Sequence, residues 1–191
     1  MKNIAVLISG SGSNLQAIID KCEGEFPAKI KLVISNKASA YGLTRAAEHG
    51  IDSVVIDNKL FPDRESFDNA IHDSLLENNI DFVCLAGFMR VLTSKFVNKW
   101  QGKMINIHPS LLPKYKGLDT HQRAIDAKDS HAGCTVHWVS AEVDAGEIIC
   151  QKKVEIANTD TAESLAKKVL EQEHICYSDA LEKIFKDYIS R

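Results

Sequence analysis

Long apolar runs are missing from this sequence of 191 residues. The apolar stretch near the N-terminus covers only Ile4 to Ile8 and is followed by turn residues, whereas a membrane-spanning helix needs about 20 apolar residues. The same stretch does not have the form of a secretory signal peptide either. We therefore expect a cytoplasmic protein that has no membrane partner.

A large excess of positive charge is also missing. The chain has 23 Lys and Arg residues against 26 Asp and Glu residues, which gives a net charge of -3. Proteins that bind nucleic acids through phosphate contacts are usually basic. A nucleic-acid partner is therefore not expected, although local basic residues can still bind a small anion.

Closely spaced cysteines are missing as well. The sequence contains no CxxC motif and no cysteines and histidines at the spacing of metal ligands. An odd, dispersed set of cysteines is typical of reduced, buried thiols in a cytosolic protein, so no metal site is predicted. The five residues are Cys22, Cys84, Cys134, Cys150 and Cys176.

No repeat, low-complexity segment or linker divides the chain. Hydrophobic residues make up 45% and charged residues 26% of the sequence, which is ordinary for a globular protein. A chain of this length buries most of its apolar surface without disulfides. We expect one domain over residues 1–191. Small molecules are the expected partners, and the sequence does not distinguish a monomer from a homodimer.

The first half alternates short apolar runs with amphipathic stretches. Continuous apolar runs are typical of strands that are covered on both faces, and apolar residues at helical spacing indicate the helices between them. Such a succession predicts a Rossmann-like, mostly parallel sheet with helices on both faces. The predicted strands are 3–9, 29–35, 53–56, 82–86 and 103–107, and the predicted helices are 14–21, 42–49, 63–78 and 94–99.

The pattern changes after Pro109. Residues 120–127 have a helical pattern, and residues 132–139 alternate, with Cys134, Val136 and Trp138 on one face. Residues 148–156 form another predicted strand. A turn containing Asp144 joins these two strands, so we expect an antiparallel pair that extends the sheet. A long helix beginning at about residue 161 closes the chain.

The first predicted strand runs directly into Gly10-Ser11-Gly12-Ser13-Asn14 and then into a helix. In nucleotide-handling α/β proteins, glycines at this place let the backbone approach a phosphate, and free N–H groups at the helix start bind it. The side chains of Ser13 and Asn14 add donors. The loop therefore predicts an anion site, and a tight turn without ligand is the alternative.

A dinucleotide site is less consistent with this loop. The GxGxxG motif requires a third glycine, but Leu15 occupies that position. The motif also requires an acidic residue near the end of the second strand, which here ends in Ser35-Asn36-Lys37. No Walker lysine follows the loop. The sequence therefore favours a simple phosphate monoester.

The segment 104–113 carries the most information. Side chains alternate along a strand, so Asn106 and His108 lie on one face while Ile105 and Ile107 point into the packing. A tetrahedral intermediate needs hydrogen-bond donors for its oxyanion and a group that exchanges protons near neutral pH. An amide and an imidazole at a strand end are suited to acyl-transfer chemistry.

Two further residues qualify this hypothesis. Asp144 lies in the turn Val143–Gly146 and gains significance only if that turn folds back onto His108, where its carboxylate would favour the imidazolium form. Ser110 has no Gly-x-Ser-x-Gly elbow around it, so we expect a structural role. The Leu112–Pro113 bond is a candidate for the cis form.

Several segments together resemble the glycinamide ribonucleotide formyltransferases, which belong to the wider group of formyl-folate enzymes. They are SGSGSNLQAII, LAGFMRVL, NIHPSLLPKYKG, HWVSAEVDAGEII and LEQEH, and the similarity covers essentially the whole chain. NIHPSLLP with its downstream aspartate is typical of the wider group, whereas SGSGSN narrows the resemblance to the glycinamide ribonucleotide branch.

The resemblance implies that a formyl group passes from 10-formyltetrahydrofolate to glycinamide ribonucleotide in purine synthesis, with no metal. It implies a phosphate-binding half, 1–108, and a folate-binding half, 109–191. The implied catalytic set is Asn106, His108 and Asp144. The implied ribotide ligands are Gly12, Ser13, Asn14 and Glu173, and the implied folate ligands are Arg64, Met89, Arg90, Val91, Leu92, Asn106, Ser140, Ala141, Glu142, Val143 and Asp144.

One departure and three alternatives stay open. Leu170 stands where some family members carry a polar residue, which puts the detailed ribotide contacts in doubt.

A proton relay through water near Thr135 or His137 is one route to release tetrahydrofolate. The alternatives are a formyltetrahydrofolate hydrolase, a methionyl-tRNA formyltransferase and a nucleotide-binding module without catalysis; the first two usually carry an additional domain.

Overall fold

The computed structural model describes the backbone of residues 1–189 and the side chains of residues 1–186. Within this part of the chain, seven strands form one sheet in the order β3-β2-β1-β4-β5-β6-β7. Strands β1 to β5 are parallel, whereas β6 runs antiparallel to both β5 and β7. The strands are β1 (Lys2–Ile8), β2 (Ala28–Ser35), β3 (Asp52–Val55), β4 (Phe82–Leu85), β5 (Met104–His108), β6 (His131–Trp138) and β7 (Ile148–Glu155).

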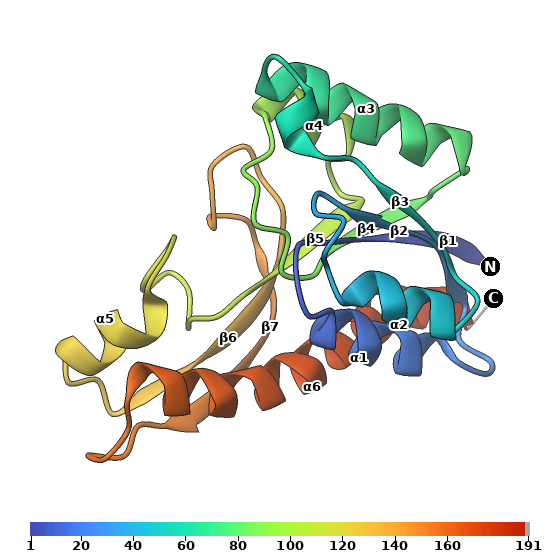
Figure 1. Cartoon of the computed structure of the whole chain (residues 1–191). Helices are drawn as coiled ribbons and strands as arrows, with labels where there is room; N and C mark the ends of the chain where they lie inside the picture. The colour runs from blue at the N-terminus through green and yellow to red at the C-terminus, as the bar shows by residue number, and fades with distance from the viewer. Residues whose placement is uncertain (190–191) are drawn as a thin grey trace.

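Helices cover both faces of this sheet, as Figure 1 shows. Helices α1, α2 and α6 lie on one face, and α3 and α4 lie on the other. The predicted fold class is confirmed, and the ends of the predicted elements agree with the structure within one residue. The helices are α1 (Ser13–Cys22), α2 (Gly42–Glu48), α3 (Arg64–Glu77), α4 (Ser94–Lys99), α5 (Thr120–Asp126) and α6 (Ala162–Ile189), with a short 3-10 helix at Asn58–Leu60 that the sequence pattern did not predict.

The central strand β1 is buried on both faces, and its residues divide strictly by parity. Ile4, Val6 and Ile8 belong to the apolar cluster that includes residues of α1 and α6. Ala5 and Leu7 belong to the cluster that includes residues of α3 and α4. This division follows from the two-residue repeat of a strand, and it explains why the sequence of β1 is continuously apolar.

The core on the α1 and α6 side joins both halves of the chain. One apolar cluster contains Leu15 of α1, Cys134 of β6 and Leu181 of α6. In addition, the buried Tyr177 hydroxyl of α6 donates a hydrogen bond to the Leu85 carbonyl at the end of β4 (3.0 Å). The C-terminal helix therefore supports the sheet edge at which β1, β4 and β5 end.

The helix starts differ in a way that matters for function. The Asp63 carboxylate accepts a hydrogen bond from the Ser66 amide (2.7 Å) and caps α3. Helix α1 instead begins after Gly12, which has no side chain to serve as a cap. The first amides of α1 are therefore available to a ligand.

All five cysteines are free thiols; Cys84, Cys134 and Cys176 are buried as predicted, whereas Cys22 and Cys150 are half-buried. Burial raises the pKa of Cys22 and of Cys150 to about 12, so these thiols are protonated at neutral pH and are poor nucleophiles. No described helix has the length and apolar character needed to cross a membrane.

Candidate active site

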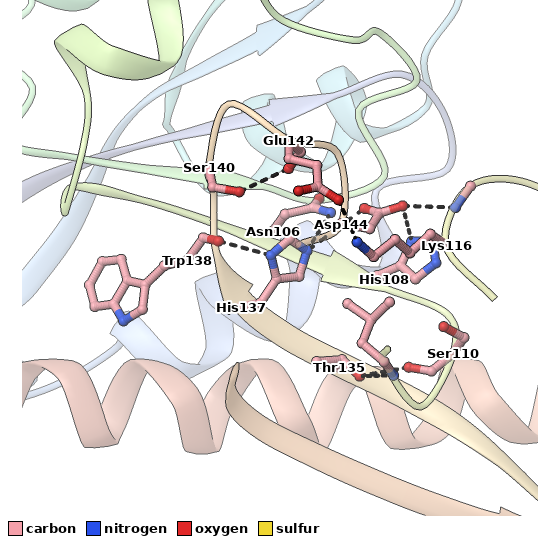
Figure 2. A network of polar contacts seen from close by, with 12 residues as sticks. Asn106, His108, Ser110, Lys116, Thr135, His137, Trp138, Ser140, Glu142 and Asp144 are labelled. Carbon is pink, nitrogen blue, oxygen red and sulfur yellow. Dashed lines mark hydrogen bonds and ion pairs between the residues drawn. The ribbon is translucent and has the colours of Figure 1, made fainter. Parts of the chain in front are cut away.

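Strand β5 brings Asn106 and His108 to the same face of the sheet. Ile105 and Ile107, which alternate with them, are buried in the α1 and α6 cluster, while Asn106 is half-buried and His108 is 6% exposed. The strand ends at His108, at the edge where ligands bind in parallel α/β sheets. Figure 2 shows both side chains beside the turn that follows β6.

The Asp144 carboxylate folds back onto His108. Its Oδ2 lies 3.4 Å from His108 Nδ1, and only 9% of the Asp144 side chain is exposed. Two features hold the turn in this position. The Gly117 amide donates to Oδ2 (2.9 Å), and Gly146 lies so close to Trp138 that an added Cβ would be 1.6 Å from the Trp138 carbonyl oxygen.

The other nitrogen of His108 also has an acceptor. Nε2 lies 2.9 Å from the backbone carbonyl oxygen of Tyr115. A carboxylate therefore faces one ring nitrogen and a carbonyl faces the other. A ring with hydrogen on both nitrogens donates to both acceptors, and this imidazolium form is the one that provides a proton and positive charge.

His137 holds the amide of Asn106. Its Nδ1 lies 2.9 Å from the Trp138 carbonyl oxygen, so this nitrogen carries the hydrogen, and Nε2 accepts from Asn106 Nδ2 (3.3 Å). Burial lowers the pKa of His137, although the Trp138 carbonyl and Asp144 partly oppose this effect. A neutral His137 therefore orients the Asn106 amide, which the sequence pattern alone did not indicate.

The buried Thr135 hydroxyl holds the loop that follows His108. Its hydroxyl donates to the Ser110 carbonyl (2.6 Å) and accepts from the Leu112 amide (3.1 Å) and from Gln151 Nε2 (2.9 Å). These three hydrogen bonds brace the loop after His108. Of the two residues considered for a water relay, only His137 contacts Asn106 and lies near Asp144.

The same loop bears out two smaller predictions. The Ser110 hydroxyl donates to the Lys114 carbonyl (2.7 Å), as expected of a structural serine. The Leu112–Pro113 peptide bond is cis.

Two buried side chains from distant elements hold the segment implied for folate binding. The Met89 amide donates to the Ser9 hydroxyl at the end of β1 (2.8 Å), and the Thr93 amide donates to Asp68 of α3 (2.7 Å). Among the described residues, no backbone partner is recorded for residues 90–92 between these two points. Sequence reasoning missed Ser9 and Asp68. The signals that could have found them are that Ser9 is a polar residue directly after an apolar strand and that Asp68 is an acidic residue next to the buried Phe67.

The other implied folate ligands lie in this segment, at the start of α3 and in the turn after β6. Met89, Val91 and Val143 are exposed apolar residues, with 62%, 53% and 49% of their surface accessible. Arg64 lies in an open hollow with Asn69 and Thr93 at the start of α3. In the turn that carries Asp144, the Ser140 hydroxyl donates to the Glu142 carbonyl (2.8 Å), and Glu142 forms an ion pair with Lys116 (2.8 Å).

The residues implied for ribotide binding meet at the start of α1. Asn14 Nδ2 donates to Glu173 Oε2 of α6 (2.7 Å), and both side chains are buried. The other amide atom, Asn14 Oδ1, is buried and has no hydrogen-bond partner. Such an orphaned polar atom is costly unless a ligand satisfies it. Leu170 lies half-buried one turn before Glu173 on the same helix.

We expect Glu173→Gln to stabilise the protein at pH 8 more than at pH 4. Burial raises the pKa of Glu173 above 4.5, and the Asn14 hydrogen bond offsets only part of this effect. The folded state therefore holds the proton more tightly than the unfolded state, so the contribution of Glu173 to stability is complete below pH 4.5 and is lost as the pH rises through the folded pKa. Glutamine does not ionise and avoids this loss.

The measurement is Tm against pH for the two proteins. A gain of about 1 kcal/mol corresponds to about 2–4 °C in a chain of this size. The exposed Glu171 on the same helix provides the matched control, Glu171→Gln, for which no pH-dependent gain is expected. A Tm difference for Glu173→Gln that does not change between pH 4 and pH 8 would contradict the prediction.

The described residues contain no group of three or more His, Cys, Asp or Glu side chains arranged to hold a metal ion. The fold and the site together define a Rossmann-like α/β protein whose polar residues gather at the carboxyl edge of the sheet. A family model described as "Formyl transferase" matches residues 2–181. The chain belongs to the formyl transferase family.

The similar proteins described here differ in length. A phosphoribosylglycinamide formyltransferase of Haemophilus influenzae is 52% identical over 93% of this chain and 84% of its own length. A trifunctional purine biosynthetic protein of Chironomus tentans is 50% identical over 98% of this chain, but the chain spans only 14% of that larger protein. A crystal structure of phosphoribosylglycinamide formyltransferase from Bacillus halodurans has a TM-score of 0.93 at 37% identity and covers 98% of this chain and 97% of that one.

Proposed function

We propose that this protein transfers the formyl group of 10-formyltetrahydrofolate to the amine of glycinamide ribonucleotide, a step of de novo purine synthesis in the cytoplasm. Membership of the formyl transferase family and the names of full-length relatives support this reaction class. The observation that carries the proposal is the contact between His108 and Asp144, with Asn106 on the same face of β5. Both substrates are small molecules.

The reaction proceeds by direct attack of the substrate amine on the formyl carbon. The carbonyl oxygen then becomes an oxyanion, which the Asn106 amide and the positive charge of protonated His108 stabilise. Asp144 keeps His108 charged and oriented. The attacking amine loses one proton, and the folate nitrogen that leaves gains one, so His108 serves as the group that exchanges protons near neutral pH. No covalent enzyme intermediate and no metal are required.

The two substrates approach the site from different elements. The ribotide binds at Gly12, Ser13, Asn14 and Glu173, where the first amides of α1 and the unpartnered Asn14 oxygen supply the contacts. Formyl-folate lies between the segment 89–92 and the turn 140–144. The exposed apolar side chains at 89, 91 and 143 contact its rings, Arg64 lies at the outer end, and backbone groups of residues 90–92 provide hydrogen bonds.

A single assay tests this function against its alternatives. The enzyme is incubated with 10-formyltetrahydrofolate, with and without glycinamide ribonucleotide, and tetrahydrofolate release is followed. We expect release only with the ribotide present, and no change when a chelator is added. Release without ribotide would indicate a hydrolase, and release that requires initiator methionyl-tRNA would indicate the tRNA formyltransferase. Binding without release would indicate a module that has no catalytic activity.

A further inference from the structure

In the glycine loop between β1 and α1, the carbonyl groups of Gly10, Ser11 and Gly12 all accept hydrogen bonds. The Gly10 carbonyl accepts from the Gly42 amide at the start of α2 (3.1 Å). The Ser11 carbonyl accepts from the Arg45 Nε of the same helix (3.0 Å). The Gly12 carbonyl accepts from the Gln16 amide in the first helical turn of α1 (2.9 Å). Helix α2 therefore holds two of the three peptide groups.

These contacts determine the direction of the loop amides. Apart from Leu112–Pro113, the described peptide bonds are trans, and in a trans peptide the N–H points opposite to the preceding C=O. The amides of Ser11, Gly12 and Ser13 consequently point away from α2 and from the helical turn. None of them has a recorded acceptor among the described residues. Gly12 is left-handed, with φ 70°, and a left-handed residue next to a helical one forms an anion-binding nest.

Helix α2 lies against the loop without intervening side chains. A Cβ added to Gly12 would lie 2.5 Å from Gly42 Cα, and one added to Gly42 would lie 2.4 Å from Ile8 Cδ1. Arg45 is held in place as well, because Nη1 donates to Gln16 Oε1 (3.3 Å) and the guanidinium lies 5.2 Å from the Tyr41 ring centroid. The loop geometry therefore depends directly on the position of Arg45.

Charge provides a second argument. The loop 10–14 contains no charged side chain, and the acidic Glu173 is hydrogen-bonded to Asn14 beside it. A phosphate placed there needs a compensating cation. The positive charge of Arg45 also acts on the residues beside the loop. Together with burial, it lowers the pKa of His174, the residue that follows Glu173. Among the described residues, Arg45 is the cation that bonds to the loop.

We propose that Arg45 is a positioning residue that makes the enzyme selective for a phosphorylated substrate. Its guanidinium fixes and polarises the Ser11–Gly12 peptide, so that the amide on the opposite side binds the phosphate more strongly. Arg45 thus acts through the loop and does not contact the phosphate. The inference rests on the proposed function, because it assigns this loop to the ribotide.

The test compares wild-type enzyme with Arg45→Met, which keeps the apolar stem but removes the charge and the donors. We expect KM for glycinamide ribonucleotide to rise about 10-fold or more, the loss typical of a charge-assisted hydrogen bond. We expect kcat and KM for formyl-folate to be unchanged. With the dephosphorylated ribonucleoside, both enzymes should have the same kcat/KM. The control is Lys21→Met, which removes one positive charge near the far end of α1, and no change in KM for the ribotide is expected.

A second measurement does not depend on catalysis. In wild-type protein, titration with inorganic phosphate should shift the amide resonances of Ser11 and Gly12, and Arg45→Met should need about 10-fold more phosphate for the same shift. Equal titrations for the two proteins would overturn the inference, as would an equal loss of kcat/KM with the phosphorylated and dephosphorylated substrates. The two claims can fail separately. If Arg45→Met weakens phosphate binding but the wild-type protein releases no tetrahydrofolate, the role of Arg45 is retained and the proposed function is rejected.

Discussion

His108→Ala is expected to lower kcat by at least about 100- to 1000-fold, the usual cost of removing one oxyanion donor. The substitution also removes the group that exchanges protons near neutral pH. It takes away the partner of Asp144, whose side chain is only 9% exposed. The KM values of both substrates should change little, because the ribotide loop and the segment 89–92 are held by other residues.

Single-turnover rates and steady-state constants at saturating ribotide provide the measurement. The matched control is His131→Ala, because His131 is exposed on β6 and, within the described part of the chain, its ring bonds only to Ser130. Its kcat should equal that of the wild type. Near-normal turnover by folded His108→Ala enzyme would remove this residue from the mechanism.

The second large effect is expected for Asp144→Asn, with a loss of kcat that is also of the order of 100- to 1000-fold. Asparagine has nearly the same shape and tolerates the left-handed conformation of this position, where φ is 51°. Its amide oxygen can still accept from the Gly117 amide. The change therefore removes the charge that favours the imidazolium form of His108 while it preserves the turn.

The control is Asp126→Asn on α5, an exposed aspartate whose carboxylate accepts a hydrogen bond from Gln122. The double variant His108→Ala and Asp144→Asn should be no slower than His108→Ala alone, because residues that act as a unit are not additive. If the two losses multiply, Asp144 acts independently of His108, and the assigned role for the aspartate is wrong.

The geometry of the site follows from the point at which the sheet changes direction. Strands β1, β4 and β5 are parallel and end at one edge, which places the glycine loop, the segment 89–92 and His108 beside one another. Strand β6 then runs antiparallel, away from the carboxyl end of β5, and ends at Trp138 opposite Ile105. The turn between β6 and β7 folds back from there, so that Asp144 reaches His108. A wholly parallel sheet would need a long crossover between these strands.

The sequence alone determined the elements and the chemistry available to them. Continuous apolar runs predicted the parallel strands because both faces of a buried strand are covered, and the alternation in 132–139 predicted the antiparallel extension. The two-residue repeat was enough to place Asn106 and His108 on one face. These features depend on neighbouring residues, so a local pattern contains them.

Only the tertiary structure decided which distant groups meet. Asp144 contacts His108 although 36 positions separate them in the chain, and no local pattern specifies that return. The same holds for Ser9 and Asp68, which hold the ends of segment 89–93, and for Arg45, which bonds to Ser11. Each is a single polar residue in an otherwise ordinary element, and its role arises from packing against a remote segment. The reason is that a hydrogen bond depends on the positions of its two groups in space and not on their separation along the chain.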